Sequence, residues 1–291
     1  MIRNQTLDLD FPTRFWALTA KSVASYKNFF LSYLFLAVVA YVPFFIIGSF
    51  SGPEMQDIFE FFHGGFLDII IFLTLPTIRQ QNQVYPFATI QLFFQRFFAS
   101  AVIIILVQLG VLLYFARSFA AVSISAIIIG LVPYVFLLFA GFYLIMENSR
   151  KMISIKSNMI SSIKIVKKQF FTIFWSYINI TIICILPLFL FTIYYLGNHP
   201  EITAFAETLD ATSRQSDVQS GQKLLEILQL IAGENGFKWS RITIHIVLRP
   251  IKSLFLSFLF LGALYRTSPD LVNSFLGIAA TVPPGSEIDE A

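Results

Sequence analysis

Residues 150–171, RKMISIKSNMISSIKIVKKQFF, separate two long hydrophobic runs that contain no charged side chain. Apolar residues recur in this stretch at intervals of three and four, which is the period of an α-helix. Lys, Ser and Asn fill most other positions, so one face is apolar and the other is polar and cationic. A helix of this kind lies in a membrane surface with its lysines at anionic headgroups. The apolar positions are Met152, Ile155, Met159, Ile163, Val166 and Phe170, and the headgroup lysines are Lys156, Lys164, Lys167 and Lys168.

The composition is that of an all-α polytopic membrane protein. Hydrophobic residues make up 56% of the chain and charged residues 13%, whereas soluble domains have about 25% charged residues. The net charge of +3 comes from basic residues beside the hydrophobic runs, so it orients the chain in a membrane and does not indicate nucleic-acid binding. The single cysteine, Cys184, lies inside an apolar run, which excludes an intrachain disulfide and a thiolate metal cluster.

The hydrophobic runs predict six membrane spans. A spanning helix needs about 20 apolar residues, and four runs of this length contain no charge. Two further runs are interrupted, one by Asp68 and the other by Arg249 and Lys252. The uncharged runs are 29–50, 97–116, 118–146 and 169–198, and the interrupted runs are 61–78 and 242–265.

The distribution of Lys and Arg predicts that both termini lie in the cytoplasm. With that orientation the inner segments hold 13 basic residues and the outer segments hold 5, as the positive-inside rule requires. Residues 1–28 then form a cytoplasmic amphipathic segment and residues 29–266 a six-span membrane domain. Residues 51–60 form a short outer connection, residues 199–241 an extracytoplasmic loop, and residues 267–291 a cytoplasmic tail.

The outer loop and the tail carry helix and disorder signals. Residues 222–232 have the spacing of a short amphipathic helix, and Gly233 and Asn235-Gly236 are expected to end it. The tail from Pro269 onward is short, acidic and expected to be disordered.

A short motif occurs at the inner end of three predicted spans. Each time, a basic residue comes just before two phenylalanines, at residues 27–30, 96–98 and 168–171. The motif indicates an internal repeat of an amphipathic segment followed by a span. The alternative is that basic and aromatic residues are what any inner membrane border prefers.

Residues 144–147, Leu-Ile-Met-Glu, with the helix and span that follow, resemble a pattern of bacterial six-span proteins. The ending Arg249-Pro250, a span and then Leu-Tyr-Arg at 264–266 is similar to the closing signature of the same group. The group comprises the YciC-like inner-membrane proteins and the membrane domain attached to some glycerophosphodiester phosphodiesterases. The resemblance implies an all-helical protein of the bacterial inner membrane with no established activity of its own. The soluble phosphodiesterase barrel of the fused members has no counterpart here.

Asp68 and Arg249 are expected to form an ion pair inside the membrane. Each lies seven residues into its run from the outer end, roughly 10 Å deep at 1.5 Å per residue. A lone charge at such a depth costs about 2.5 to 3.5 kcal/mol, so each needs a partner or water. Lys252, one turn deeper, is the alternative partner of Asp68. In another interpretation residues 242–248 lie flat on the outer surface and Pro250 starts a short span, which leaves Arg249 among headgroups.

Two histidines lie near these charges. His63 precedes Asp68 by five residues, and His245 shares a helical face with Arg249. The four residues could line a wet cavity that opens outward and relays protons or binds an anionic substrate. The alternative, which we favour, is that both histidines are simply solvated near an interface. No metal site is expected, because His63 and Asp68 lack a third ligand.

The chain has no motif for nucleotide hydrolysis or proteolysis, and we expect neither enzymatic activity nor a cofactor. The leading hypothesis is a membrane protein that contacts anionic lipid, a membrane-protein partner or a second copy of itself through the basic helix. The alternative is a transporter or permease component that uses the polar cavity around Asp68 and Arg249.

Overall fold

The computed structural model describes residues 14–51, 53–95, 97, 100–106, 132–147, 153–198 and 235–277, and this part of the chain is helical and contains no strand. The helices up to the first gap of any length are α1 (Phe15–Asn28), α2 (Phe30–Ser51), α3 (Pro53–Phe72), α4 (Leu75–Gln81) and α5 (Pro86–Gln95). Those that follow are α8 (Ala140–Glu147), α9 (Ile153–Lys168), α10 (Phe170–Asn198), α13 (Asn235–Tyr265) and α14 (Pro269–Leu276).

Within these ranges, four helical segments are long and apolar enough to cross a membrane: Phe30–Ile47, Phe62–Gln81, Phe170–Tyr195 and Trp239–Tyr265. A fifth is reached if α5 and Ser100–Leu106, which are bent by 76° relative to each other, form one broken span. Val132–Met146 is apolar but shorter. Residues 107–131, which hold much of the predicted third and fourth spans, lie outside the described part of the chain, so the count of six stays a prediction.

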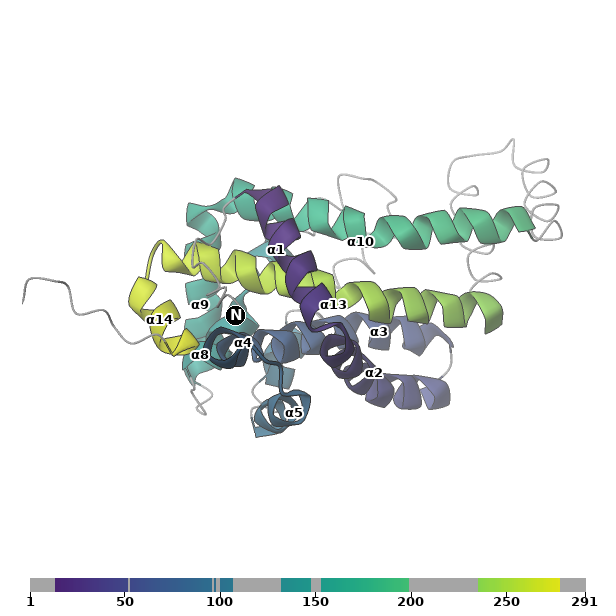
Figure 1. The fold of residues 1–291 in the computed structure, drawn as a ribbon, viewed down its shortest axis with the longest axis horizontal. Helices are drawn as coiled ribbons and strands as arrows, with labels where there is room; N and C mark the ends of the chain where they lie inside the picture. The colour runs from purple at the N-terminus through teal and green to yellow at the C-terminus, as the bar shows by residue number, and fades with distance from the viewer. Residues whose placement is uncertain are drawn as a thin grey trace, which may run out of the picture.

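The helices α3 and α13 form the centre of the bundle, and α2 and α10 lie at its periphery. About 72% of each central span is buried, compared with 28% for α2 and 17% for α10. Along residues 253–264 of α13, consecutive side chains on every face are buried. The exposed side chains of α10, in contrast, are large and apolar, as lipid requires. In Figure 1, α10 and α13 follow the long axis of the molecule and α9 runs across it at one end.

The helix α1 lies obliquely against α13 (Figure 1) and not beyond its end. The ring of Phe15 packs against that of Phe255, with centroids 5.4 Å apart. One α1 hydroxyl, that of Tyr26, donates a hydrogen bond to the carbonyl oxygen of Val247 at 2.7 Å. Burial raises the pKa of Tyr26, which keeps the hydroxyl protonated as the donor.

Two predicted connections are helical where the structure describes them. Residues 51–60, predicted to join two spans on the outer side, are helical from Pro53, where α3 begins directly after α2. Proline fits the first turn of a helix, where its missing N–H is not needed. Asn235-Gly236, expected to end a short helix over residues 222–232, lies in the first turn of α13, and residues 222–232 lie outside the described part of the chain. Pro250 lies inside α13, so residues 242–248 belong to the same helix as Arg249 and do not form a separate surface segment.

The beginning of the predicted disordered tail is a helix. A proline starts α14, and Gly277, with φ 68°, ends it in the left-handed conformation that glycine favours. Val272 and Leu276 of α14 are buried. The ring of Phe275 stacks on Phe72 of α3 at 4.7 Å. The alternation of polar and apolar residues therefore docks α14 onto the bundle, although its net composition is acidic.

The motif of a basic residue before two phenylalanines lies at helix junctions. The helices α1 and α2 are separated by Phe29 alone, and α9 and α10 by Gln169 alone. At the remaining motif, residues 96–98, the 76° bend separates α5 from Ser100–Leu106. Each motif thus marks a place where one helix ends and a span begins.

Candidate functional site

The ion pair expected between Asp68 and Arg249 is present between the two central helices. Nη2 of Arg249 lies 3.3 Å from Oδ2 of Asp68, and the side chains are 16% and 10% exposed, respectively. Asp68 lies six residues after Phe62 and Arg249 ten residues after Trp239, so their depths from those span ends are about 9 Å and about 15 Å. The hydrogen bond of this pair links positions 181 residues apart in the chain.

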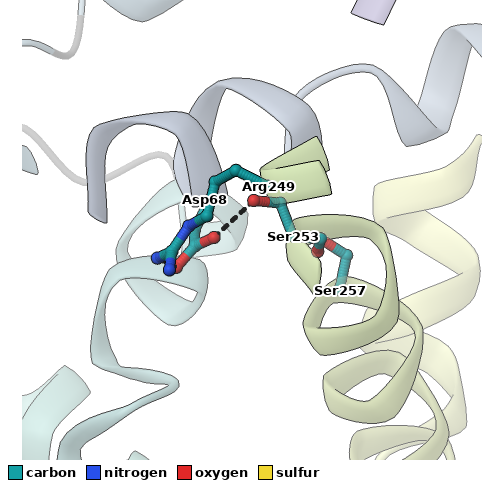
Figure 2. Close-up of polar contacts among 4 residues, drawn as sticks. All are labelled: Asp68, Arg249, Ser253 and Ser257. Atoms are coloured by element: carbon teal, nitrogen blue, oxygen red, sulfur yellow. Dashed lines mark hydrogen bonds and ion pairs between the residues drawn. The ribbon is translucent and has the colours of Figure 1, made fainter. Parts of the chain in front are cut away.

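Asp68 has a second partner on the same helix as Arg249. The hydroxyl of Ser253 donates to Oδ1 of Asp68 at 2.5 Å, and the hydroxyl of Ser257 donates to the carbonyl oxygen of Ser253 at 2.8 Å. Figure 2 shows the four residues where α3 meets α13. Both carboxylate oxygens therefore accept a hydrogen bond, which is how a buried carboxylate remains charged.

Gly64 makes room for the guanidinium group of Arg249. A Cβ atom at residue 64 would lie 2.3 Å from Nη2 and 2.6 Å from Cζ of Arg249. Atoms cannot approach that closely, so any larger residue at this position would displace the arginine from Asp68. Gly64 is thus part of the ion-pair site, one helical turn before the aspartate.

The two histidines lie next to the ion pair. Nε2 of His63 is 3.4 Å from the carbonyl oxygen of Ala37, and its ring meets the ring of Tyr41 edge to face. The ring centroids of His63 and His245 are 5.7 Å apart. Nδ1 of His63 and Nε2 of His245 are both buried without a hydrogen-bond partner. His63 has no exposed surface, so the expectation that it is solvated at an interface is wrong.

Lys252 is not the partner of Asp68. Its Nζ lies over the aromatic ring of Tyr177 of α10, 4.7 Å from the centroid, and this side chain is 7% exposed. The ring of Tyr177 contacts that of Tyr134, with centroids 5.6 Å apart. A cation over an aromatic face is stabilised by the ring quadrupole, by about 2 kcal/mol where water is excluded.

A small cavity lies beside Asp68, with a volume of about 40 Å³. Its lining includes Asp68, Gly65 and Tyr134, and the other lining residues are mostly apolar. A cavity of this volume has room for one or a few water molecules, since one water needs roughly 10–15 Å³. His63, His245 and Arg249 are not among its lining residues, so this cavity is not the predicted common cavity of four polar residues.

The lysines of α9 occupy its outward face together with two isoleucines. Lys156, Lys164, Lys167 and Lys168 are all exposed, and Ile160 and Ile163 are 42% and 40% exposed. The side of α9 that faces the protein buries two polar side chains, Asn158 and Ser162, together with Ile165 and Val166. The Ser162 hydroxyl donates to the carbonyl oxygen of Phe136 at 2.7 Å.

Three contributors to the buried cluster were not identified from the sequence: Gly64, Ser253 and Tyr177. Ser253 lies four residues after Arg249, so the shared helical face was a usable signal. Nothing in the sequence pairs Gly64 or Tyr177 with α13. Among the described residues, no group of three or more His, Cys, Asp and Glu side chains could hold a metal ion.

Comparison with protein-family models, curated proteins and solved structures finds no match to this chain.

Proposed function

We propose that this chain is a non-enzymatic integral membrane protein that binds anionic lipid headgroups through the outward face of α9. In this proposal it is a six-span protein of the bacterial inner membrane, of the YciC-like type, with both termini in the cytoplasm. Support for a membrane location comes from the long apolar helices and from the exposed apolar side chains of α2 and α10.

The single observation that carries the proposal is the combination of cations and apolar side chains on one exposed face. At 100° per residue, the four lysines and the two isoleucines share an arc of about 140° on α9. Single exposed isoleucines also occur on soluble surfaces, but two of them on one face with four lysines are the pattern of an in-plane helix. In such a helix the apolar chains enter the acyl region while the lysines reach the phosphates.

The polar buried face of α9 supports the same arrangement. Asn158 and Ser162 lie toward the protein, and α9 packs mainly on α8. Ile165 and Val166 are buried on the same side and Ser162 donates a hydrogen bond to Phe136, so α9 is docked by apolar packing and hydrogen bonding, and its cationic side is left for lipid. No ion pair of Lys156, Lys164, Lys167 or Lys168 with a carboxylate occurs among the described residues.

The expected contribution of the lysines can be calculated. Each Lys near an anionic surface contributes about 1 kcal/mol, so three of them change the preference for anionic over zwitterionic lipid by roughly 100-fold at most. The test replaces Lys164, Lys167 and Lys168 with Gln in the full-length protein. Native mass spectrometry of protein released from nanodiscs then counts bound phosphatidylglycerol against phosphatidylcholine.

The matched control replaces the same lysines with Arg, which keeps the charge and the length of the side chain. We expect the Gln variant to lose its preference for phosphatidylglycerol and the Arg variant to keep it. Equal retention of phosphatidylglycerol by the Gln variant and the unmodified protein would contradict the proposal.

A transporter or permease component is the second candidate. The observation that favours it is the buried cluster of Asp68, Arg249, His63 and His245 on the two central helices, because ionisable groups inside a membrane mark substrate or proton paths. Flux of protons or small anions into proteoliposomes tests this candidate. Flux that is the same for Asp68→Asn and the unmodified protein would remove it.

A further inference from the structure

The buried cluster on α13 has an excess of positive charge. Asp68, Arg249 and Lys252 carry formal charges that sum to +1, and the two histidines can only add to this sum. Asp68 is already used by Arg249 and Ser253. Among the described residues, the contact made by the Lys252 ammonium is the ring of Tyr177, not a carboxylate.

Several hydrogen-bonding atoms of the helices that form this cluster are buried and have no partner. They belong to α13, α3 and α10: Nε of Arg249, Nε2 of His245, Nδ1 of His63 and Oγ1 of Thr181. A buried polar group without a partner costs about 1–3 kcal/mol. Four such atoms on three helices that pack together are unusual, since buried polar atoms are normally satisfied.

These atoms belong to one region of the protein. On α13, His245, Arg249 and Lys252 are spaced four and three residues apart, so they share one face, and Lys252 contacts Tyr177 of α10. The ring of His245 also lies 5.7 Å from the ring of His63 of α3. On α10, Tyr177, Thr181 and Cys184 are spaced four and three residues apart, so they share the face that looks toward α13. The face of α10 next to this one is open to lipid, since Ile182 is 56% and Ile185 53% exposed.

We propose that Lys252, together with Arg249, His245 and the hydroxyl of Thr181, binds one phosphate-type oxyanion between α10 and α13. The oxyanion supplies the negative charge that the cluster lacks. It also accepts hydrogen bonds from the buried donors, which an apolar occupant could not do. Its source is either the headgroup of a phospholipid that enters beside α10 or free phosphate. This site is separate from the lysines of α9 and does not depend on them.

The test measures thermal unfolding of the full-length protein, purified in a neutral detergent, by tryptophan fluorescence. One arm titrates inorganic phosphate and the other titrates short-chain phosphatidylglycerol. A ligand that binds only the folded protein raises the midpoint temperature in a saturable way. We expect saturation in at least one arm. Saturation with inorganic phosphate would show that the free anion is sufficient to occupy the site. Saturation with phosphatidylglycerol alone would show that the site binds a phospholipid headgroup.

The variants are Lys252→Met and Thr181→Val, which keep the shape of the side chain. Loss of a hydrogen bond to a charged group should raise the Kd about tenfold or more. Thr192→Val is the matched control for Thr181, because the Thr192 hydroxyl already donates to the carbonyl oxygen of Leu188 at 2.8 Å. Lys164→Met is the control for Lys252, because Lys164 lies exposed on α9.

Both controls should keep the Kd of the unmodified protein. Thr181→Val tests the site even if Lys252→Met does not fold. It removes only an unpartnered hydroxyl and should not destabilise the protein without ligand. The proposal is overturned if neither ligand raises the midpoint. It is also overturned if the Kd is unchanged in Thr181→Val and in every folded Lys252→Met preparation.

Discussion

Replacing Asp68 with Asn measures how strongly the ion pair holds the two central helices together. The substitution keeps the shape of the side chain but raises the formal charge of the group Asp68, Arg249 and Lys252 from +1 to +2. Removing one partner of a buried pair costs about 3–5 kcal/mol. Because Arg249 is 16% exposed and Asp68 10% exposed, some water reaches the pair, and we expect a loss of about 3 kcal/mol in the free energy of unfolding.

The opposite substitution, Arg249→Gln, should cost less. It lowers the same sum of charges to zero, and the carboxylate of Asp68 keeps its hydrogen bond from Ser253 at 2.5 Å. We expect a loss of about 1–2 kcal/mol, which is the lower part of the range for one partner of a charged hydrogen bond. The order of the two single variants is therefore a test of charge balance and not only of contact.

The assay is equilibrium unfolding in mixed micelles with increasing SDS, followed through the fluorescence of the three tryptophans. The double variant should be more stable than Asp68→Asn alone, which requires a coupling of about 2–3 kcal/mol, larger than the cost of Arg249→Gln. Strictly additive losses would refute the interaction between the pair. A larger loss for Arg249→Gln than for Asp68→Asn would refute the charge-balance reasoning even if the coupling is found.

Three further predictions concern neighbouring residues and use the same unfolding assay unless stated. Ser253→Ala should cost about 2 kcal/mol in the free energy of unfolding, because a hydrogen bond to a carboxylate is lost. The control Ser257→Ala loses only a hydrogen bond within its own helix at 2.8 Å and should cost about 0.5 kcal/mol. Equal losses for the two variants would count against the hydrogen bond from Ser253 to Asp68. Gly64→Ala forces the guanidinium group of Arg249 to shift. It should cost up to about 3 kcal/mol, the cost when Asp68→Asn leaves Arg249 unpaired, and should be nearly neutral in the Arg249→Gln background. The control Gly141→Ala meets only the end of an isoleucine side chain at 3.1 Å and should cost under about 1 kcal/mol. Phe275→Ala removes the ring that stacks on Phe72 at 4.7 Å and should weaken the docking of α14 by about 2 kcal/mol. The expected result is faster amide hydrogen exchange in α14 alone. Unchanged exchange in α14 would contradict this prediction.

The ion pair was predictable because a charged side chain inside a membrane is costly unless it is paired or hydrated. A carboxylate and a guanidinium at similar depth in two apolar runs need each other or water. The spans of α2, α10 and α13 were predictable for the same reason, since their length and apolar composition suffice. The partner choice of Lys252 was not predictable, because a cation over an aromatic ring leaves no pattern in the sequence.

The helix ends were harder to predict because proline, glycine and asparagine occur at both kinds of boundary. Pro53 begins a helix within the predicted outer connection, and Asn235, expected to end a helix, begins one. Pro269 begins α14, whose acidic surroundings indicated disorder. In each case the helix packs on a partner distant in sequence, and that packing decides between the two readings of the same local signal.

The orientation of α9 could not be predicted from periodicity alone. In water, the apolar face of a helix turns toward the protein. At a membrane surface both the protein and the acyl chains accept apolar side chains, so polarity no longer distinguishes the two sides. Ile163, assigned to the apolar stripe, is 40% exposed, whereas Asn158 and Ser162 are fully buried. The hydrogen bond from Ser162 to Phe136 and the burial of Ile165 and Val166 therefore set the rotation of α9.

The position of the intramembrane charges indicates how the protein assembles. Asp68, Arg249 and Lys252 all lie on the two central helices, whereas the described parts of α2 and α10, which face lipid, carry no charged side chain in their spans. The partners Asp68 and Arg249 are 181 residues apart in the chain. During synthesis the carboxyl group of Asp68 therefore has no Arg249 to pair with until α13 is inserted. Protonation of this carboxyl group lowers the free-energy cost of keeping it in the membrane. Pairing with Arg249 then holds α3 next to α13. An oxyanion at Lys252 would complete the same charge balance once α10 and α13 lie side by side.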